Sequence, residues 1–162
     1  MNKVYNLKNP LLGMNFKTHL AIGGALALAF LPAVNNKWVF FPLVLIASIF
    51  PDVDTGFSTI GANKMFRPLQ WFVNHRGLIH SFTICVLFSV FLAFVWGPLG
   101  LPVFLGYSFH LLADSFTVEG IEPFWPFGKR IEGTIKVNGI MEQPIFFVFL
   151  IIDALLLIRI FM

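Results

Sequence analysis

The chain has 162 residues, enough for one domain; 57% of them are hydrophobic and only 12% are charged. Soluble globular proteins contain about 45–50% apolar and about 25% charged residues, so this composition excludes an ordinary soluble domain and indicates an integral membrane protein. The formal net charge of +3 comes from single, scattered basic residues rather than from a basic cluster, so nucleic acid is not expected as a stable partner.

The chain is predicted to divide into an N-terminal polar tail, residues 1–17, and a single membrane-embedded domain, residues 18–162. No small-residue cleavage site follows the first apolar run, so we expect that run to be kept as a helix rather than removed as a signal peptide. The single cysteine, Cys85, lies within an apolar run, and no intrachain disulfide is expected.

Five apolar segments are predicted to be membrane-spanning helices, because about 20 apolar residues cross a bilayer as a helix. They are His19–Val34, Trp38–Phe50, Leu78–Trp96, Leu99–Val118 and the segment from Gln143 to the C-terminus. The first two are short, so they either cross a locally thinned bilayer or form a re-entrant hairpin. The predicted fold class is all-α: an integral membrane bundle of about five transmembrane helices.

The order of these segments predicts which loops share a side of the membrane. The N-terminus, the loop Pro51–Gly77 and the loop Glu119–Glu142 fall on one side, whereas Lys37, Arg159 and the C-terminus fall on the other. The first side holds the remaining nine basic residues: Lys3, Lys8, Lys17, Lys64, Arg67, Arg76, Lys129, Arg130 and Lys136. Because positive residues concentrate on the cytoplasmic side, that side is predicted to be the cytoplasm.

Residues with metal-binding chemistry are predicted to meet at this cytoplasmic face. They are His19, Asp52, Asp54, His75, His80, His110 and Asp114. Imidazole nitrogen and carboxylate oxygen suit zinc, manganese or iron. His110 and Asp114 lie four apart on one face of an apolar helix, where an ionisable residue is a functional hypothesis by default. Seven candidates allow either one ion with supporting residues or two ions bridged by a carboxylate.

Single members of this set also have simpler explanations. A lone histidine at a membrane boundary is typical of an interfacial ring, and Asp52 and Asp54 also suit a helix cap or a turn. Arg76 is either a basic anchor or a ligand for a phosphate oxygen. Glu142 is interpreted as a loop charge, and Asp153 as an isolated residue that faces the bundle outside the site. The joint convergence of all seven candidates nevertheless favours a metal site.

Four short motifs follow one another in a specific order. They are Thr-His-Leu-Ala-Ile-Gly-Gly at 18–24, Phe-Pro-Asp-Val-Asp at 50–54, His-Arg-Gly-Leu-Ile-His-Ser at 75–81, and His-Leu-Leu-Ala-Asp at 110–114 with Trp-Pro-Phe at 125–127. This set resembles the YdjM-like family of LexA-regulated, membrane-bound, metal-dependent hydrolases, and the resemblance covers nearly the whole chain from Lys17 onward. It implies a hydrolase of the inner membrane whose expression belongs to the SOS response.

That family is itself similar to the helical, zinc-dependent phospholipase C and single-strand nuclease superfamily, which cleaves phosphoester bonds. By this similarity His110 and Asp114 would match its His-x-x-x-Asp pair, with the aspartate bridging two metals. No histidine follows His110 in this chain, so the ligands for a third metal are missing. The resemblance therefore implies one or two divalent ions, with zinc as the first candidate.

The same similarity assigns the remaining ligands only in part. His19 would match the early histidine of the superfamily, one of Asp52 or Asp54 its first aspartate, and His75 or His80 its second histidine. Within each pair the choice stays open.

The predicted function is hydrolysis of a phosphoester or ester bond by a metal-activated water. Whichever of Asp52 and Asp54 is not a ligand would act as general base, and Arg76 would stabilise charge on a phosphate. A site in the headgroup layer favours a membrane lipid or a lipid-linked substrate, although a small cytosolic molecule is also open. The alternatives are a divalent-metal transporter and a binding or regulatory membrane protein with a structural metal. The sequence leaves the oligomeric state open.

Overall fold

The computed structural model describes residues 14–54, 78–137 and 139–162. Within these ranges all regular secondary structure is helical, which confirms the all-α part of the predicted fold class, and extended pairing is limited to two isolated β-bridges. The helices are α1 (Phe16–Phe30), η1 (Leu31–Ala33), α2 (Lys37–Ala47), η2 (Phe50–Asp54), α4 (Phe82–Val95), α5 (Gly97–Ser115) and α6 (Glu142–Phe161).

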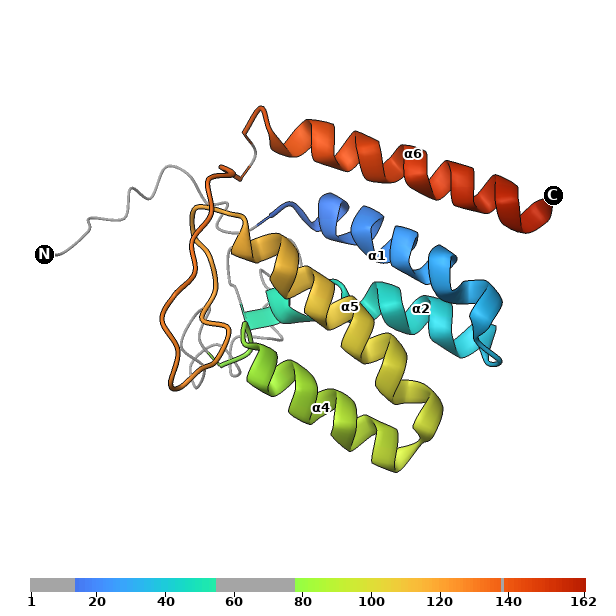
Figure 1. Ribbon diagram of the computed structural model, residues 1–162, viewed down its shortest axis with the longest axis horizontal. Coiled ribbons are helices and arrows are strands. Elements are labelled where there is room, and N and C mark those ends of the chain that lie inside the picture. The colour runs from blue at the N-terminus through green and yellow to red at the C-terminus, as the bar shows by residue number, and fades with distance from the viewer. Residues whose placement is uncertain (1–13, 55–77, 138) are drawn as a thin grey trace, which may run out of the picture.

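The long helices lie side by side, and α5 is at the centre of their packing (Figure 1). Helix α5 contacts α1, α2 and α4, whereas α6 packs along α1. The start of α1, the end of α2, the start of α4, the end of α5 and the start of α6 all lie at the left end of the molecule in Figure 1. The helix ends that carry the predicted ligands are therefore gathered at one end of the bundle.

Local chemistry explains where several of these helices begin. The side chain of Asn15 accepts a hydrogen bond from the backbone N–H of Lys17 at 3.1 Å and caps α1, and Ser81 caps α4 by accepting from the N–H of Ile84 at 3.3 Å. Such caps satisfy backbone donors that have no partner within the helix. Helix α5 starts with Gly97 and Pro98, and proline suits this position because its missing N–H would be unpaired there.

Two glycines allow α1 and α5 to pack closely against the C-terminal end of α2, because a side chain at either position would collide with it. A Cβ atom added at Gly106 of α5 would lie 2.4 Å from the carbonyl oxygen of Val44, and one at Gly23 of α1 would lie 2.5 Å from the hydroxyl oxygen of Ser48. Small residues at such crossings are typical of helices that associate in membranes. Ser48 is thereby held between α1 and α5.

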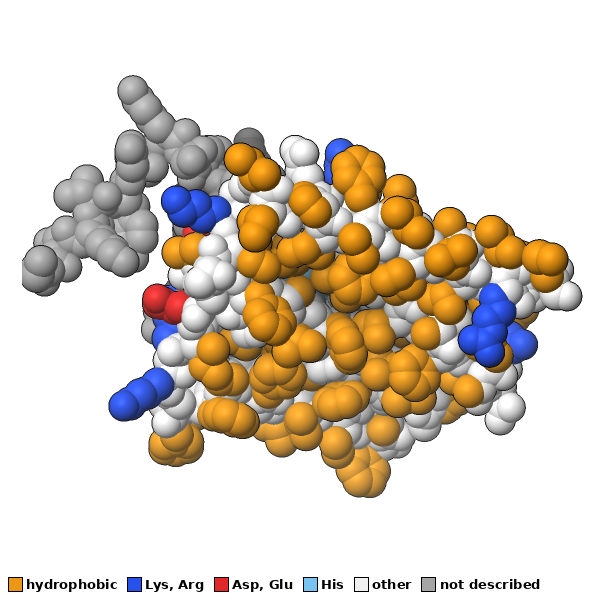
Figure 2. Space-filling view, turned by 45° about the horizontal axis from the view of Figure 1, so that its top comes forward, with side chains coloured by type: hydrophobic (Ala, Val, Ile, Leu, Met, Phe, Trp, Pro, Cys, Tyr) orange, Lys and Arg blue, Asp and Glu red, His pale blue; other side chains and the backbone are white. Residues whose placement is uncertain are grey.

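The outer surface of the bundle is apolar. Figure 2 shows hydrophobic side chains covering the visible face between charged side chains at its two ends. Large exposed hydrophobic residues occur throughout α4 and α6, including Leu87, Phe91, Phe94, Ile151 and Leu155. A surface of this kind faces lipid or protein rather than water.

Two helical stretches in the described ranges are long and apolar enough to cross a membrane, Phe16–Ala33 and Glu142–Phe161. Helix α2 has 11 residues and α4 has 14. At 1.5 Å per residue α2 is about 17 Å long, well short of a hydrocarbon core of about 30 Å. The structure thus supports the expectation that the second segment is short, while a bundle of five crossings stays a prediction.

Candidate metal centre

Four of the predicted ligands form a compact cluster at the gathered end of the bundle. Asp52, His80, His110 and Asp114 each offer one ligand atom, and these atoms all lie within 4.8 Å of one another. All four residues are buried. They come from η2, from the turn before α4 and from α5, so three separate parts of the chain build the cluster.

Asp114 lies between the histidines. Its Oδ1 is 3.4 Å from Nε2 of His19, and its Oδ2 is 3.6 Å from Nε2 of His80 and 3.7 Å from Nε2 of His110. The backbone N–H of Met14 donates to Oδ1 at 3.3 Å and helps to fix the carboxylate. One carboxylate that faces several imidazoles through both oxygens has the arrangement of a shared ligand.

The orientation of His110 is set by a backbone carbonyl. Its Nδ1 lies 2.8 Å from the carbonyl oxygen of Ser48, and a carbonyl can only accept, so Nδ1 carries the proton. The lone pair of Nε2 is then directed into the cluster, 3.9 Å from Oδ1 of Asp52. A backbone carbonyl that orients a ligating histidine through its other nitrogen is the usual support of a metal ligand.

His19 lies beside the four-residue cluster rather than within it. Its ring stacks on that of His110, with centroids 3.9 Å apart and planes at 20°. Within the described part of the chain, neither of its ring nitrogens has a hydrogen-bond partner. His19 therefore has both the proximity and the unused donor or acceptor atoms of an additional ligand.

The turn that carries His80 is held by groups that the sequence analysis did not identify. The buried Tyr107 donates its hydroxyl to the carbonyl of Ile79, and the hydroxyl of Ser81 donates to the carbonyl of Leu78 at 2.8 Å. Tyr107 lies three residues before His110, so both point to the same side of α5. In the sequence, a tyrosine three residues before the predicted ligand His110 is the signal that could have identified Tyr107 as a supporting residue.

The interpretation of Glu142 as a loop charge is wrong. Glu142 is the first residue of α6, its exposed fraction is 3%, and its carboxylate accepts hydrogen bonds from the N–H of Asn15 and from the hydroxyl of Thr18. These bonds connect the start of α6 to the start of α1, next to the Met14 amide that binds Asp114. Glu142 thus supports the centre from outside it.

The remaining predicted residues cannot be placed in this geometry. His75 and Arg76 lie outside the described residues, as does the side chain of Asp54, whose backbone ends η2. Of the two pairs, Asp52 and His80 are the members whose side chains are described, and both belong to the cluster. The roles predicted for Asp54 and Arg76 in catalysis stay predictions.

An all-helical bundle with an apolar outer surface and a buried cluster of two histidines and two aspartates defines a class of membrane protein with a candidate metal centre. Comparison with known proteins then identifies the family. The chain belongs to the YdjM family, described as YdjM inner membrane protein, whose family model matches residues 14–161. The resemblance found in the four sequence motifs is thereby confirmed.

Two curated relatives carry the name Inner membrane protein YdjM, one from Escherichia coli (strain K12) and one from Shigella flexneri. Each is 29% identical to this chain over 114 residues, which cover 65% of this chain and 58% of the relative. The match therefore spans less than two thirds of the length of these relatives. No solved structure matches the chain.

Proposed function

We propose that this protein is an inner-membrane, metal-dependent hydrolase that cleaves a phosphoester or ester bond. The observation that carries the proposal is the buried cluster of Asp52, His80, His110 and Asp114, whose ligand atoms lie within 4.8 Å of one another. Membrane location rests on the family, and hydrolysis rests on the chemistry that such a centre makes available.

The residues present fit a divalent ion. Ligands about 2.0–2.2 Å from a tetrahedral zinc lie about 3.3–3.6 Å apart. Within the cluster Asp114 lies 3.6 Å from His80 and 3.7 Å from His110, and Asp52 lies 3.9 Å from His110. Nε2 of His110 is buried without a hydrogen-bond partner among the described residues, and an unsatisfied buried group costs about 1–3 kcal/mol. Coordination of a cation would remove that cost. Mixed nitrogen and oxygen ligands suit zinc first and manganese or iron next.

The protein side chains would divide the chemical work. A divalent ion held here supplies Lewis-acid polarisation of a phosphoryl or ester group and activation of water. Asp114 and His110 hold and orient the ligand set, and Asp54 is the candidate general base because Asp52 already belongs to the cluster. Arg76 is the candidate partner of a phosphate oxygen.

The position of the cluster at one end of an apolar bundle supports a lipid-like substrate. The connection between α5 and α6 lies at that end and exposes Phe124 and Phe127, the latter at 95%. Exposed aromatic rings beside polar loops are typical of the headgroup layer. A lipid or a lipid-linked phosphoester is therefore the substrate that the site would meet first.

The distribution of basic residues between the two ends of the bundle supports a multi-pass topology in which the metal centre lies at the cytoplasmic end. Lys17 lies in the first turn of α1, and Lys129, Arg130 and Lys136 follow α5, so these four cations belong to the site end. Lys37 and Arg159 belong to the opposite end. The excess of cations at the site end favours a cytoplasmic location for that end.

A structural metal is the second candidate function. Four protein ligands is the number found in closed structural zinc sites, and the four residues of the cluster are all buried. Transport receives less support, because transport sites lie near the bilayer midplane whereas this cluster lies at one end of the bundle.

One reconstitution separates these functions. The full chain is purified, freed of metal, placed in liposomes and reloaded with zinc, and its metal content, its zinc uptake and its hydrolysis of bis(4-nitrophenyl) phosphate and of phosphatidylglycerol are measured. Zinc-dependent hydrolysis that is lost in His110→Ala and absent from the metal-free wild type is expected. Zinc uptake without hydrolysis would establish transport, and tightly held zinc without either activity would establish a structural site. Either result would overturn the hydrolase.

A further inference from the structure

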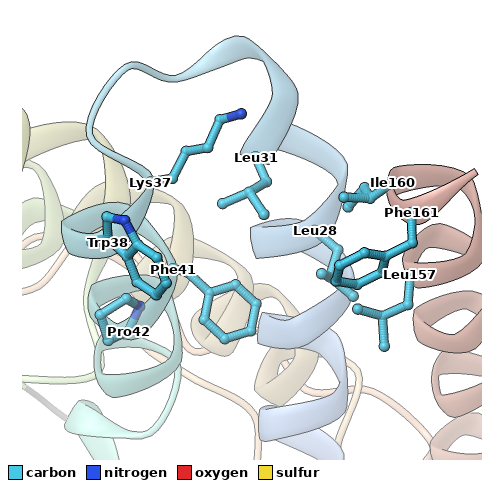
Figure 3. A pocket seen from close by; sticks show the side chains of 9 residues that line it. All are labelled: Leu28, Leu31, Lys37, Trp38, Phe41, Pro42, Leu157, Ile160 and Phe161. Atoms are coloured by element: carbon cyan, nitrogen blue, oxygen red, sulfur yellow. The ribbon is translucent and has the colours of Figure 1, made fainter.

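A groove lies at the end of the bundle opposite the metal cluster, where α1, α2 and α6 meet (Figure 3). Its volume is 430 Å³, which is in the range of small-molecule sites. The walls are apolar and include Leu28, Phe41, Pro42, Leu157 and Phe161. The groove thus offers a long apolar surface to a ligand rather than a set of hydrogen bonds.

One cation, Lys37, lines this groove, and a second, Arg159, lines the cavity next to it. Figure 3 shows the side chain of Lys37 among those that line the groove, with its amino group directed away from the apolar side chains. A neighbouring cavity of 460 Å³ shares Lys37, Leu28 and Leu31 with the groove and is also lined by Arg159. Among the described residues no acidic side chain lines either cavity, and neither cation forms an ion pair there. The two positive charges are therefore available to an anionic ligand.

The surroundings place the mouth of the groove at a membrane boundary. Trp38, which lines the groove, is 95% exposed at the start of α2, directly after the polar turn formed by residues 35–37. Tryptophan collects at the headgroup level, and long basic side chains extend from the apolar region toward that level. An apolar groove that adjoins a cavity lined by two cations at this level complements an amphiphile with an acyl chain and an anionic head.

We propose that this groove binds an anionic phospholipid of the phosphatidylglycerol class. The acyl chain lies along Leu28, Phe41 and Leu157 in the groove, and the phosphate lies in the adjoining cavity that Lys37 and Arg159 both line. This site goes beyond the proposed function, because the groove and the metal cluster lie at opposite ends of the helices and one lipid headgroup cannot occupy both. The bound lipid is a resident ligand rather than the substrate.

The charge requirement is tested with the full chain in detergent, by native mass spectrometry during titration with phosphatidylglycerol or phosphatidylcholine of identical acyl chains. Each basic residue near an anionic lipid contributes about fivefold to affinity, so the double variant Lys37→Gln, Arg159→Gln should bind phosphatidylglycerol about thirtyfold more weakly. The matched control, Lys129→Gln with Lys136→Gln, removes two exposed cations at the other end and should leave binding unchanged.

The groove itself is tested by filling it. Leu157→Trp places a larger ring in the groove and should weaken retention of phosphatidylglycerol at least tenfold, whereas Leu155→Trp, at an exposed position of α6 outside the groove, should not. Unchanged thermal unfolding of all variants shows that they are folded, and this readout does not require any enzyme activity.

Four results would overturn the proposal. The first is equal affinity for both lipids, which indicates a non-specific lipid shell. The second is unchanged binding in the Lys37 and Arg159 double variant. The third is full competition by inorganic phosphate, which indicates an anion site that does not use the groove. A purified protein that carries no lipid because a second copy covers the groove would overturn it as well.

Discussion

Two aspartates lie inside apolar helices of this protein, and their surroundings differ. Asp114 in α5 faces three histidines, whereas Asp153 in α6 lies against the backbone of α1, where a Cβ added at Gly24 would be 3.0 Å from its Oδ2. A carboxylate in an apolar environment is costly unless it is paired or coordinates a cation. Of the two, Asp114 has the surroundings of a metal ligand, and Asp153 serves as its natural control.

Asp114→Asn should weaken zinc binding by about 100-fold or more. The substitution keeps the shape of the side chain but removes the negative charge of the carboxylate that faces the histidines. Loss of a group that only supports a metal ligand already lowers metal affinity about 10–100-fold. Zinc affinity is measured by competition with a chromophoric chelator on the detergent-solubilised protein. Asp153→Asn should retain the wild-type affinity; an equal loss in both variants would mean that the effect is on folding.

At the level of helices, the crossing of α2 and α5 decides whether His110 can serve as a ligand. Gly106 lies one turn before His110 and contacts the backbone of α2 near Val44, while the carbonyl of Ser48 at the end of α2 fixes Nδ1 of His110. The close approach at the glycine and the hydrogen bond at the histidine therefore depend on the same interhelical distance.

Gly106→Ala should destabilise the protein by about 1–3 kcal/mol and also weaken zinc binding. The added Cβ would meet the carbonyl oxygen of Val44 at 2.4 Å, so α5 has to move away and the contact with Ser48 lengthens. Chemical unfolding and zinc competition are the measurements. Gly97→Ala, where no atom lies within 4 Å of the added Cβ, is the matched control and should leave both quantities near wild type.

The attachment of α6 to α1 depends on a buried carboxylate at its first residue. Glu142→Gln should lower the free energy of unfolding by about 1.5–3 kcal/mol, the value of hydrogen bonds to a charged group, because the Asn15 amide and the Thr18 hydroxyl lose their charged acceptor. Glu132→Gln is the control, since that side chain is exposed. Equal stability of the two variants would show that Glu142 contributes nothing to helix attachment.

At the level of the whole molecule, a bound ion would crosslink three parts of the chain. Its ligands come from η2, from the turn before α4 and from α5, so the ion can bind in the folded arrangement and not in the unfolded chain. Binding then adds to stability by mass action.

Removal of metal should therefore lower the unfolding temperature. At a free zinc concentration about 100 times the dissociation constant, the stabilisation is about 2.7 kcal/mol, which corresponds to about 5–10 °C for a chain of this size. Differential scanning fluorimetry of the purified protein with EDTA and with excess zinc makes the measurement. An identical midpoint under both conditions, or an equal shift in Asp114→Asn, would contradict binding at this cluster.

The sequence by itself determined the class of protein, the helical fold and the family, because these depend on composition, on the length of apolar runs and on short motifs. It also indicated His110 and Asp114 together, since residues four apart share a face of any helix. These properties are local in the chain and do not require knowledge of how the helices meet.

The tertiary structure decided the rest. It brought Asp52 and His80 into the cluster, buried Glu142, and assigned supporting roles to Ser48 and Tyr107. These contacts join residues far apart in the chain, such as Ser48 and His110, which are 62 positions apart. The contact between Ser48 and His110 forms where Gly23 and Gly106 let α1 and α5 pack closely against the end of α2. No periodicity in the sequence encodes such a close approach, because it depends on the joint packing of α1, α2 and α5.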